Sequence, residues 1–151
     1  MNIILHPATI NDARSVAEIL IDVRLQCMPY APLAHRAEAT HAWVRECLIA
    51  SGGVTVAKNG AGVVGLIACS HSENCRWITQ MAVSPAYIGH GIGTQLLLHA
   101  LGTLPPPIRL YTFQANFGAR RFYERHGFCA VAYTDGSGNE ERCPDILFER
   151  L

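Results

Sequence analysis

Three glycines on alternate positions, Gly89, Gly91 and Gly93, separate an extended segment from a segment with helical periodicity. Glycine tolerates positive φ, so such a turn can bring several backbone N–H groups toward one point. The N-terminus of the following helix adds unpaired N–H donors and a partial positive charge. The sequence therefore predicts a strand, a tight turn and a helix that form an anion site from main chain.

The turn does not match the two common nucleotide-binding loops. A Walker-type loop needs a lysine followed by serine or threonine, and residues 89–94 contain no lysine. A dinucleotide-binding turn has the spacing G-x-G-x-x-G and an acidic residue about twenty positions later, whereas here the spacing is G-x-G-x-G and Phe113 stands near the acidic position. A glycine-rich turn can also serve only to bend the chain, and the turn by itself leaves that alternative open.

Extended and helical patterns alternate along the chain, with no linker and no internal repeat. Strands are expected at 2–6, 54–58, 63–70, 76–83, 108–113, 129–135 and 145–150. Helices are expected from a Thr9–Asp12 capping box to about 23, over 34–50, from the glycine turn to about 101, and over 116–126. This order predicts an α/β protein with a mixed sheet and helices on both faces.

Two local patterns support these boundaries. Asn59-Gly60 lies between two extended runs and predicts a hairpin. In the second helix an apolar stripe is expected, formed by Leu33, Ala37, Val44 and Leu48.

Composition limits the class of protein. The 151 residues are half hydrophobic, which suits one domain over 1–151 with a substantial core. Lys plus Arg equals Asp plus Glu, 12 each, so no basic excess favours a nucleic-acid partner. No apolar run reaches the length of a membrane span, and no basic, apolar leader opens the chain. We expect a soluble, cytoplasmic protein with no membrane partner.

Six cysteines form no C-x-x-C pair and lie mostly inside apolar runs. This pattern favours buried free thiols over disulfides or metal ligands, and we expect no metal site.

A second informative stretch is QANFGARRFYERHGF, residues 114–128. On a helix, Asn116 and Tyr123 are seven positions apart and share a face, and Gly127 is suited to end the helix. Taken singly, Asn116 is an ordinary helix N-cap, and an inward Tyr is an ordinary core residue.

Together, the glycine turn and this helix resemble the GNAT superfamily of N-acetyltransferases. The helix matches the family pattern N-x-x-A-x-x-F-Y-x-x-x-G-F in full, and the turn supplies Ile88-x-x-Gly91-x-Gly93. Ile88 stands where Gln or Arg is usual, which removes a side-chain contact but leaves the glycines intact. The resemblance is best over 77–128, and residues 4–20 are similar to the family's first strand and helix.

The resemblance implies a mixed, mostly antiparallel sheet of about seven strands, flanked by helices and splayed between strands four and five. It also implies acetyl-CoA as cosubstrate. The pantetheine would pair with the fourth strand at Met81, Ala82 and Val83, Asn116 would contact the CoA arm, and Tyr123 would protonate the departing thiolate. The CoA pyrophosphate would bind residues of the turn and first helical turn: Gly89, His90, Gly91, Ile92, Gly93 and Thr94.

The activity that the resemblance implies is direct attack by a primary amine, of a small molecule or a peptide N-terminus, on the acetyl thioester. Thr79 and Gln80 stand where many family members carry a glutamate base, so the base is open. A water relay from Thr79 or Gln80 is one alternative. Side chains elsewhere are the others: His35, Glu38, His71, Glu73, Glu140 and Glu141. A different class, a non-catalytic acyl-CoA-binding regulator, is favoured by the missing glutamate and opposed by Tyr123.

The acceptor would be bounded by the first two helices, the fourth strand and the last hairpin. Tyr30, His35 and Trp43 are candidates to line its pocket, and the pair Glu140-Glu141 to attract a cationic amine. The alternative is that Trp43 belongs to the core and the glutamates only solubilise a loop. Apolar edges in the last hairpin would permit a homodimer.

Overall fold

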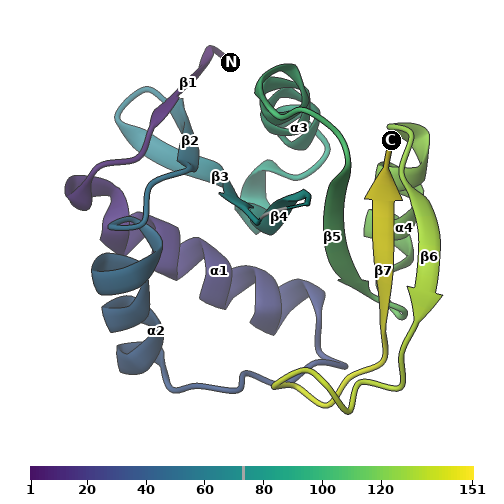
Figure 1. Cartoon of the computed structure of the whole chain (residues 1–151). Helices are drawn as coiled ribbons and strands as arrows, with labels where there is room; N and C mark the ends of the chain where they lie inside the picture. The colour runs from purple at the N-terminus through teal and green to yellow at the C-terminus, as the bar shows by residue number, and fades with distance from the viewer. Residues whose placement is uncertain (73) are drawn as a thin grey trace.

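A single seven-stranded sheet runs through the molecule, in the order β1-β2-β3-β4-β5-β7-β6 (Figure 1). The structure is a computed structural model and describes residues 1–72 and 74–151. The strands are β1 (Ile3–Pro7), β2 (Val54–Asn59), β3 (Gly62–His71), β4 (Arg76–Val83), β5 (Ile108–Phe113), β6 (Cys129–Tyr133) and β7 (Asp145–Arg150). The α-helices are α1 (Ala13–Cys27), α2 (Ala37–Trp43), α3 (Ile92–Thr103) and α4 (Phe117–Arg125), with short turns η1 (Ile10–Asp12), η2 (Val44–Leu48) and η3 (Pro85–Tyr87).

The sheet opens between β4 and β5, its one parallel pair among the described strands. These strands pair only at Arg76 with Ile108 and at Trp77 with Arg109, and then separate. The ring of Trp77 stacks on Tyr111 at 5.8 Å and 11°, where the separation begins. The predicted mixed sheet with a splay between strands four and five is therefore confirmed.

Helices cover both faces of the sheet, as the order of elements predicted. Neighbouring side chains of a strand point to opposite faces, so Leu66 packs with α1 and η2 while Ile67 packs with α3. The α3 side is the larger core and includes Tyr123 and Phe128 from the α4 region. In Figure 1, α1 and α2 lie on the side of the sheet away from α3 and α4.

The capping box before α1 is present. The backbone N–H of Thr9 donates to Asp12 Oδ2 at 2.8 Å, and Lys58 Nζ lies 3.1 Å from Asp12 Oδ1. Burial would raise the pKa of the Asp12 carboxyl, but the Thr9 N–H and the Lys58 ammonium outweigh it and hold the pKa below its ordinary value. Asp12 thus fixes the start of α1 to β2.

The second helix differs from its predicted span of 34–50. It begins at Ala37, with Arg36 in extended conformation as its N-cap, and it continues into the π-helical turn η2. Val44 and Leu48 are buried, but Leu33 and Ala37 are exposed, so the predicted apolar stripe is wrong in its first half.

Cysteine burial was only partly predicted. All six thiols are free, yet Cys27, Cys47 and Cys129 are exposed, because their apolar runs lie on helix surfaces or on the edge strand. Cys75 and Cys143 are buried.

Strand β6 forms one edge of the sheet, and all five of its residues are exposed. The homodimer suggested by apolar edges in the last hairpin stays a prediction. Among the described residues, no helix is both long and apolar enough to cross a bilayer.

Replacing Asp12 by Asn should lower the free energy of unfolding by about 1–2 kcal/mol at pH 7, because it removes the ion pair and weakens the cap. The carboxylate has a depressed pKa in the folded state, so its stabilisation is present above the ordinary pKa of about 4 and disappears as pH falls through the folded value. Urea denaturation from pH 7 to pH 3 should show the two proteins converging in acid. Asp22→Asn, at an exposed position of α1, is the matched control.

Candidate active site

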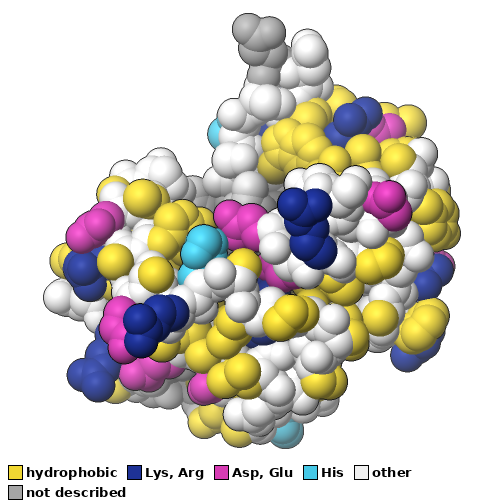
Figure 2. Space-filling model, turned by 90° about the horizontal axis from the view of Figure 1, so that it is seen from below, with side chains coloured by type: hydrophobic (Ala, Val, Ile, Leu, Met, Phe, Trp, Pro, Cys, Tyr) yellow, Lys and Arg dark blue, Asp and Glu magenta, His cyan; other side chains and the backbone are white. Residues whose placement is uncertain are grey.

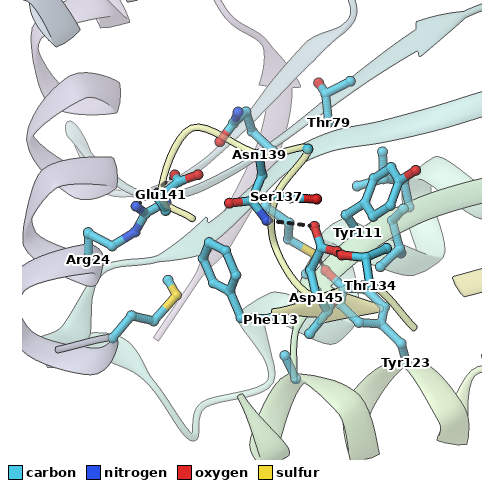
Figure 3. A pocket seen from close by; sticks show the side chains of 18 residues that line it. Arg24, Thr79, Tyr111, Phe113, Tyr123, Thr134, Ser137, Asn139, Glu141 and Asp145 are labelled. Atoms are coloured by element: carbon cyan, nitrogen blue, oxygen red, sulfur yellow. Dashed lines mark hydrogen bonds and ion pairs between the residues drawn. The ribbon is translucent and has the colours of Figure 1, made fainter. Parts of the chain in front are cut away.

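A cavity of about 660 Å³ occupies the opening between β4 and β5. Its walls are the unpaired parts of the two strands, 78–81 and 110–113, together with Tyr123 of α4 and Arg24 of α1 (Figure 3). The segment 134–145 between β6 and β7 closes the remaining side. Backbone of both strands therefore borders the cavity without a sheet partner at that edge.

The glycine turn leads from β4 into α3, and its geometry suits an anion. Gly91 is the N-cap of α3 with φ of 79°, and Gly89 has φ of 88°. A Cβ built on either glycine would meet no atom within 4 Å, so the turn is open. The first helical bond of the turn runs from Gln95 N–H to the Gly91 carbonyl, which leaves the N–H groups of 92–94 without helical partners. The predicted main-chain donors are present.

The side chains around the turn take different positions. Ile92 is buried and anchors α3, whereas Ile88 and His90 are exposed. A Cβ on Gly93 would lie 3.4 Å from Met81 Cε, an ordinary van der Waals distance, so Gly93 lies beside the Met81 side chain of β4. Thr94 is half-buried in the first helical turn.

Tyr123 points its phenol from α4 toward β4. Its O–H donates to Met81 Sδ at 3.5 Å, and its ring packs against Phe122, Phe128 and Phe148. Burial raises the pKa of the Tyr123 phenol well above its ordinary value, so the hydroxyl keeps its proton at neutral pH. The one polar group in this aromatic cluster thus reaches the wall of the cavity.

Asn116 is the N-cap of α4. Its side-chain Oδ1 accepts a hydrogen bond from the Ala119 N–H at 3.2 Å. The predicted capping role is confirmed, and the carboxamide nitrogen forms no hydrogen bond within the described chain.

A second cavity of about 570 Å³ lies on the α1 side of β4. It shares five residues with the first cavity: Arg24, Met28, Gln80, Met81 and Glu141. Trp43 lines it and is 41% exposed, so the alternative that this residue belongs to the core is wrong. His35 lines it as predicted, but Tyr30 does not, because its ring packs edge-on against Phe113 at 6.2 Å.

An ion pair and a hydrogen bond cross from the α1–α2 region to the loop before β7. Arg24 Nη1 lies 2.8 Å from Glu141 Oε2, and His35 Nε2 lies 2.9 Å from Glu140 Oε2. The Arg24 guanidinium also lies over the Phe113 ring, 5.3 Å from its centre (Figure 3). On the face seen in Figure 2, charges of both signs are interspersed among apolar side chains. The glutamates are therefore paired, and do not form a free acidic patch.

The loop between β6 and β7 is held by a buried hydrogen-bond network. Asp145 accepts hydrogen bonds from the Thr134 hydroxyl and, at 3.1 Å, from Asn139 Nδ2. The Asn139 side chain also bonds both the N–H and the carbonyl of Cys143. The three side chains of this network line the cavity between β4 and β5, and the sequence analysis singled out none of them.

Arg24 was also missed, although the sequence carries a signal. It lies four positions after Leu20 and seven after Ala17, on the apolar stripe of α1. A charged residue on a buried stripe needs a partner, and Glu141 supplies it from 117 residues away. The network around Asp145 has no comparable local signal, because its members come together only when the loop folds.

The candidate bases fall into three groups. Gln80 and Glu141 line both cavities, and Thr79 lines the first with its hydroxyl donating to the Ala68 carbonyl at 3.2 Å. Glu38 is exposed and lines neither cavity. His35 and Glu140 line the second cavity, His71 borders a separate cavity near the end of β3, and the candidate Glu73 lies outside the described residues.

Comparisons with known proteins agree with this geometry. The model of the family described as "Acetyltransferase (GNAT) family" matches residues 17–128. No curated protein matches the chain in sequence.

Solved structures share the fold at low sequence identity. An acetyltransferase of the GNAT family from Bacillus cereus superposes with a TM-score of 0.76 at 20% identity, covering 100% of this chain and 99% of that one. The apo form of YjaB from Escherichia coli gives 0.78 at 18% identity, covering 100% and 99%. The PaiA N-acetyltransferase from Thermoplasma acidophilum, solved in complex with coenzyme A, gives 0.75 at 22% identity, covering 99% of each chain.

The loop network generates a stability prediction. Asn139→Ala should lower the free energy of unfolding by about 1–3 kcal/mol, because it leaves Asp145 Oδ2 and the N–H and carbonyl of Cys143 without the Asn139 side chain as partner. Urea denaturation measures the change, and limited proteolysis should show faster cleavage within 135–143. Ser137→Ala, an exposed position of the same loop, should leave both unchanged. Equal stability of the two variants would contradict the role assigned to Asn139.

Proposed function

Because the chain belongs to the GNAT family of acetyltransferases, we propose that it transfers an acetyl group from acetyl-CoA to a primary amine of a small molecule or a peptide N-terminus. One observation carries the proposal. The glycine turn, with its free N–H groups, and the protonated Tyr123 hydroxyl both adjoin β4. They lie at the splay, where the edge of β4 that faces β5 has no partner strand.

Acetyl-CoA is the acyl donor of this family, and the chain has features that fit it. The open turn from Gly89 to Thr94 presents main-chain donors to a pyrophosphate without needing a lysine. The unpaired edge of β4, at Met81, Ala82 and Val83, can hydrogen-bond an extended amide chain such as pantetheine in the manner of an added strand. When bound, the cosubstrate supplies an activated acyl group.

The chain's own groups have three tasks in this proposal. A backbone N–H of β4 near Met81 stabilises negative charge on the acyl oxygen while the amine attacks directly. Tyr123 gives its proton to the departing sulfur, and its raised pKa means that the hydroxyl still carries that proton when the thiolate forms. Asn116, already fixed as the cap of α4, orients the CoA arm with its remaining amide nitrogen.

The amine must also lose a proton. Neither Thr79 nor Gln80 accepts a proton at neutral pH, but Glu141 and Asp145 are carboxylates that line the same cavity. Glu141 lines the acceptor side as well, so we assign the proton's route to water between the amine and Glu141.

Tyr123→Phe should lower kcat at least about tenfold while leaving the Kd for CoA nearly unchanged, because it removes one transition-state donor and little contact surface. Steady-state thiol release and a CoA titration measure the two quantities. Tyr133→Phe, on the exposed edge strand β6, serves as the matched control and should behave as wild type. Equal turnover of the two variants would remove Tyr123 from the chemistry.

Thermal shift tests the binding half of the proposal. Acetyl-CoA and CoA should each raise the melting temperature, and ATP should not, since a ligand that binds only the native state stabilises it. At a ligand concentration of about 100 times Kd, the gain is about 2.7 kcal/mol. Thiol release with an amine then establishes catalysis, whereas CoA binding without release across a broad amine panel would indicate a non-catalytic acyl-CoA-binding regulator. No response to CoA would overturn the proposed function.

A further inference from the structure

The two cavities meet at a pair of opposite charges. Arg24 and Glu141 line both cavities, and their side chains are 21% and 17% exposed to solvent. Gln80 and Met81 of β4 border the same junction, so the pair lies where an acceptor must approach the acyl group. A ligand spanning the junction therefore faces a fixed cation and a fixed anion together.

Arg24 has one edge of its guanidinium unused. Nη1 serves both Glu141 Oε2, at 2.8 Å, and the Pro32 carbonyl, at 3.4 Å. Nε is buried with no partner, and Nη2 forms no hydrogen bond to any described residue. Nε and Nη2 form the edge that binds a carboxylate with two parallel bonds, and a small side-chain adjustment exposes Nε to a ligand.

Glu141 also has capacity to spare. Only Oε2 is hydrogen-bonded within the described chain, which leaves Oε1 for a donor such as an ammonium group. The Phe113 ring and the Glu141 carboxylate already restrict the Arg24 guanidinium to this junction, so a ligand that binds there restricts the side chain little further.

The cavity on the α1 side provides an apolar chamber beside this pair. Leu20, Ile21, Val23, Leu33 and Trp43 line it. Its volume of about 570 Å³ is in the range of small-molecule sites. The other charged residues on its wall are His35 and Glu140, which are mostly exposed and paired with each other at the rim.

We propose that the acceptor is a free α-amino acid with an apolar side chain. Its carboxylate binds the open edge of Arg24, its amino group lies beside Glu141 and faces the splay at Met81, and its side chain enters the Trp43 chamber. The inference rests on the proposed function and names the substrate class of the same site.

Charge complementarity separates this substrate from its competitors. A simple amine would leave the Arg24 edge unpaired, and an amino-acid amide or a peptide N-terminus has no carboxylate beside its amino group. Because the site already holds one cation and one anion, a zwitterion satisfies both without leaving either charge unbalanced.

The test compares L-phenylalanine, L-phenylalanine amide and 2-phenylethylamine as acceptors, with L-leucine and L-methionine as further amino acids. With acetyl-CoA saturating, thiol release should give the amino acids a kcat/KM at least about tenfold above the amide and the amine. Arg24→Met/Glu141→Gln, which leaves no lone charge in the site, should remove this preference. Arg14→Met, at an exposed position of α1, should retain it.

The preference ratio distinguishes recognition from a structural defect. Because Glu141 is also assigned the proton's route, the double variant should turn over every acceptor more slowly. A loosened loop would likewise lower kcat/KM for all acceptors together, whereas loss of the carboxylate contact also changes the ratio between them. Calorimetric titration of the same compounds into the CoA-saturated protein provides a second readout that needs no turnover. The inference is overturned if the amine or the amide equals the amino acids in wild type, or if no amino acid binds. The proposed function fails separately, by absence of a CoA thermal shift and of thiol release with every amine.

Discussion

The short parallel pairing of β4 and β5 is the constraint on which the rest of the site depends. Two residue pairs join these strands, and beyond them each strand keeps hydrogen bonds only to its outer neighbour, β3 or β7. Backbone groups that lose a sheet partner must find water or a ligand. A gap in the middle of an otherwise continuous sheet is thus a place where an extended amide chain can bind, and the Tyr123 hydroxyl lies at its wall, bonded to Met81 of β4.

The two sides of this gap are built by different means. On the side of α3 and α4 the features are local: a glycine turn, a helix N-terminus and a Tyr one helix later. On the side of α1 and α2 they depend on distant segments, since Arg24 meets Glu141 and His35 meets Glu140 across more than a hundred residues. The side proposed to bind acetyl-CoA therefore depends on local sequence, while the side proposed to bind the acceptor depends on how the last loop packs against α1.

The same division explains which predictions from the sequence succeeded. The glycine turn, the Asn116 cap, the Thr9–Asp12 capping box and the order of strands and helices were all predicted, because each depends on residues within a few positions of one another. The prediction that Tyr30 lines the acceptor pocket was wrong, whereas Trp43 does line the cavity on the α1 side of β4. Whether an aromatic side chain faces a cavity or a neighbouring ring depends on the packing of segments that are remote in sequence.

By itself, the sequence determined the order of strands and helices, the glycine turn before α3 and the Asn116 cap of α4, since φ preferences, caps and periodicity act over a few residues. Only the tertiary structure decided which charged side chains pair with each other and which of their donor and acceptor atoms stay unpaired. The formal balance of 12 basic and 12 acidic residues does not show that Nε and Nη2 of Arg24 stay unpaired beside Glu141. That arrangement arises because the loop before β7, held by Asn139 and Asp145, packs against α1 across the splayed sheet.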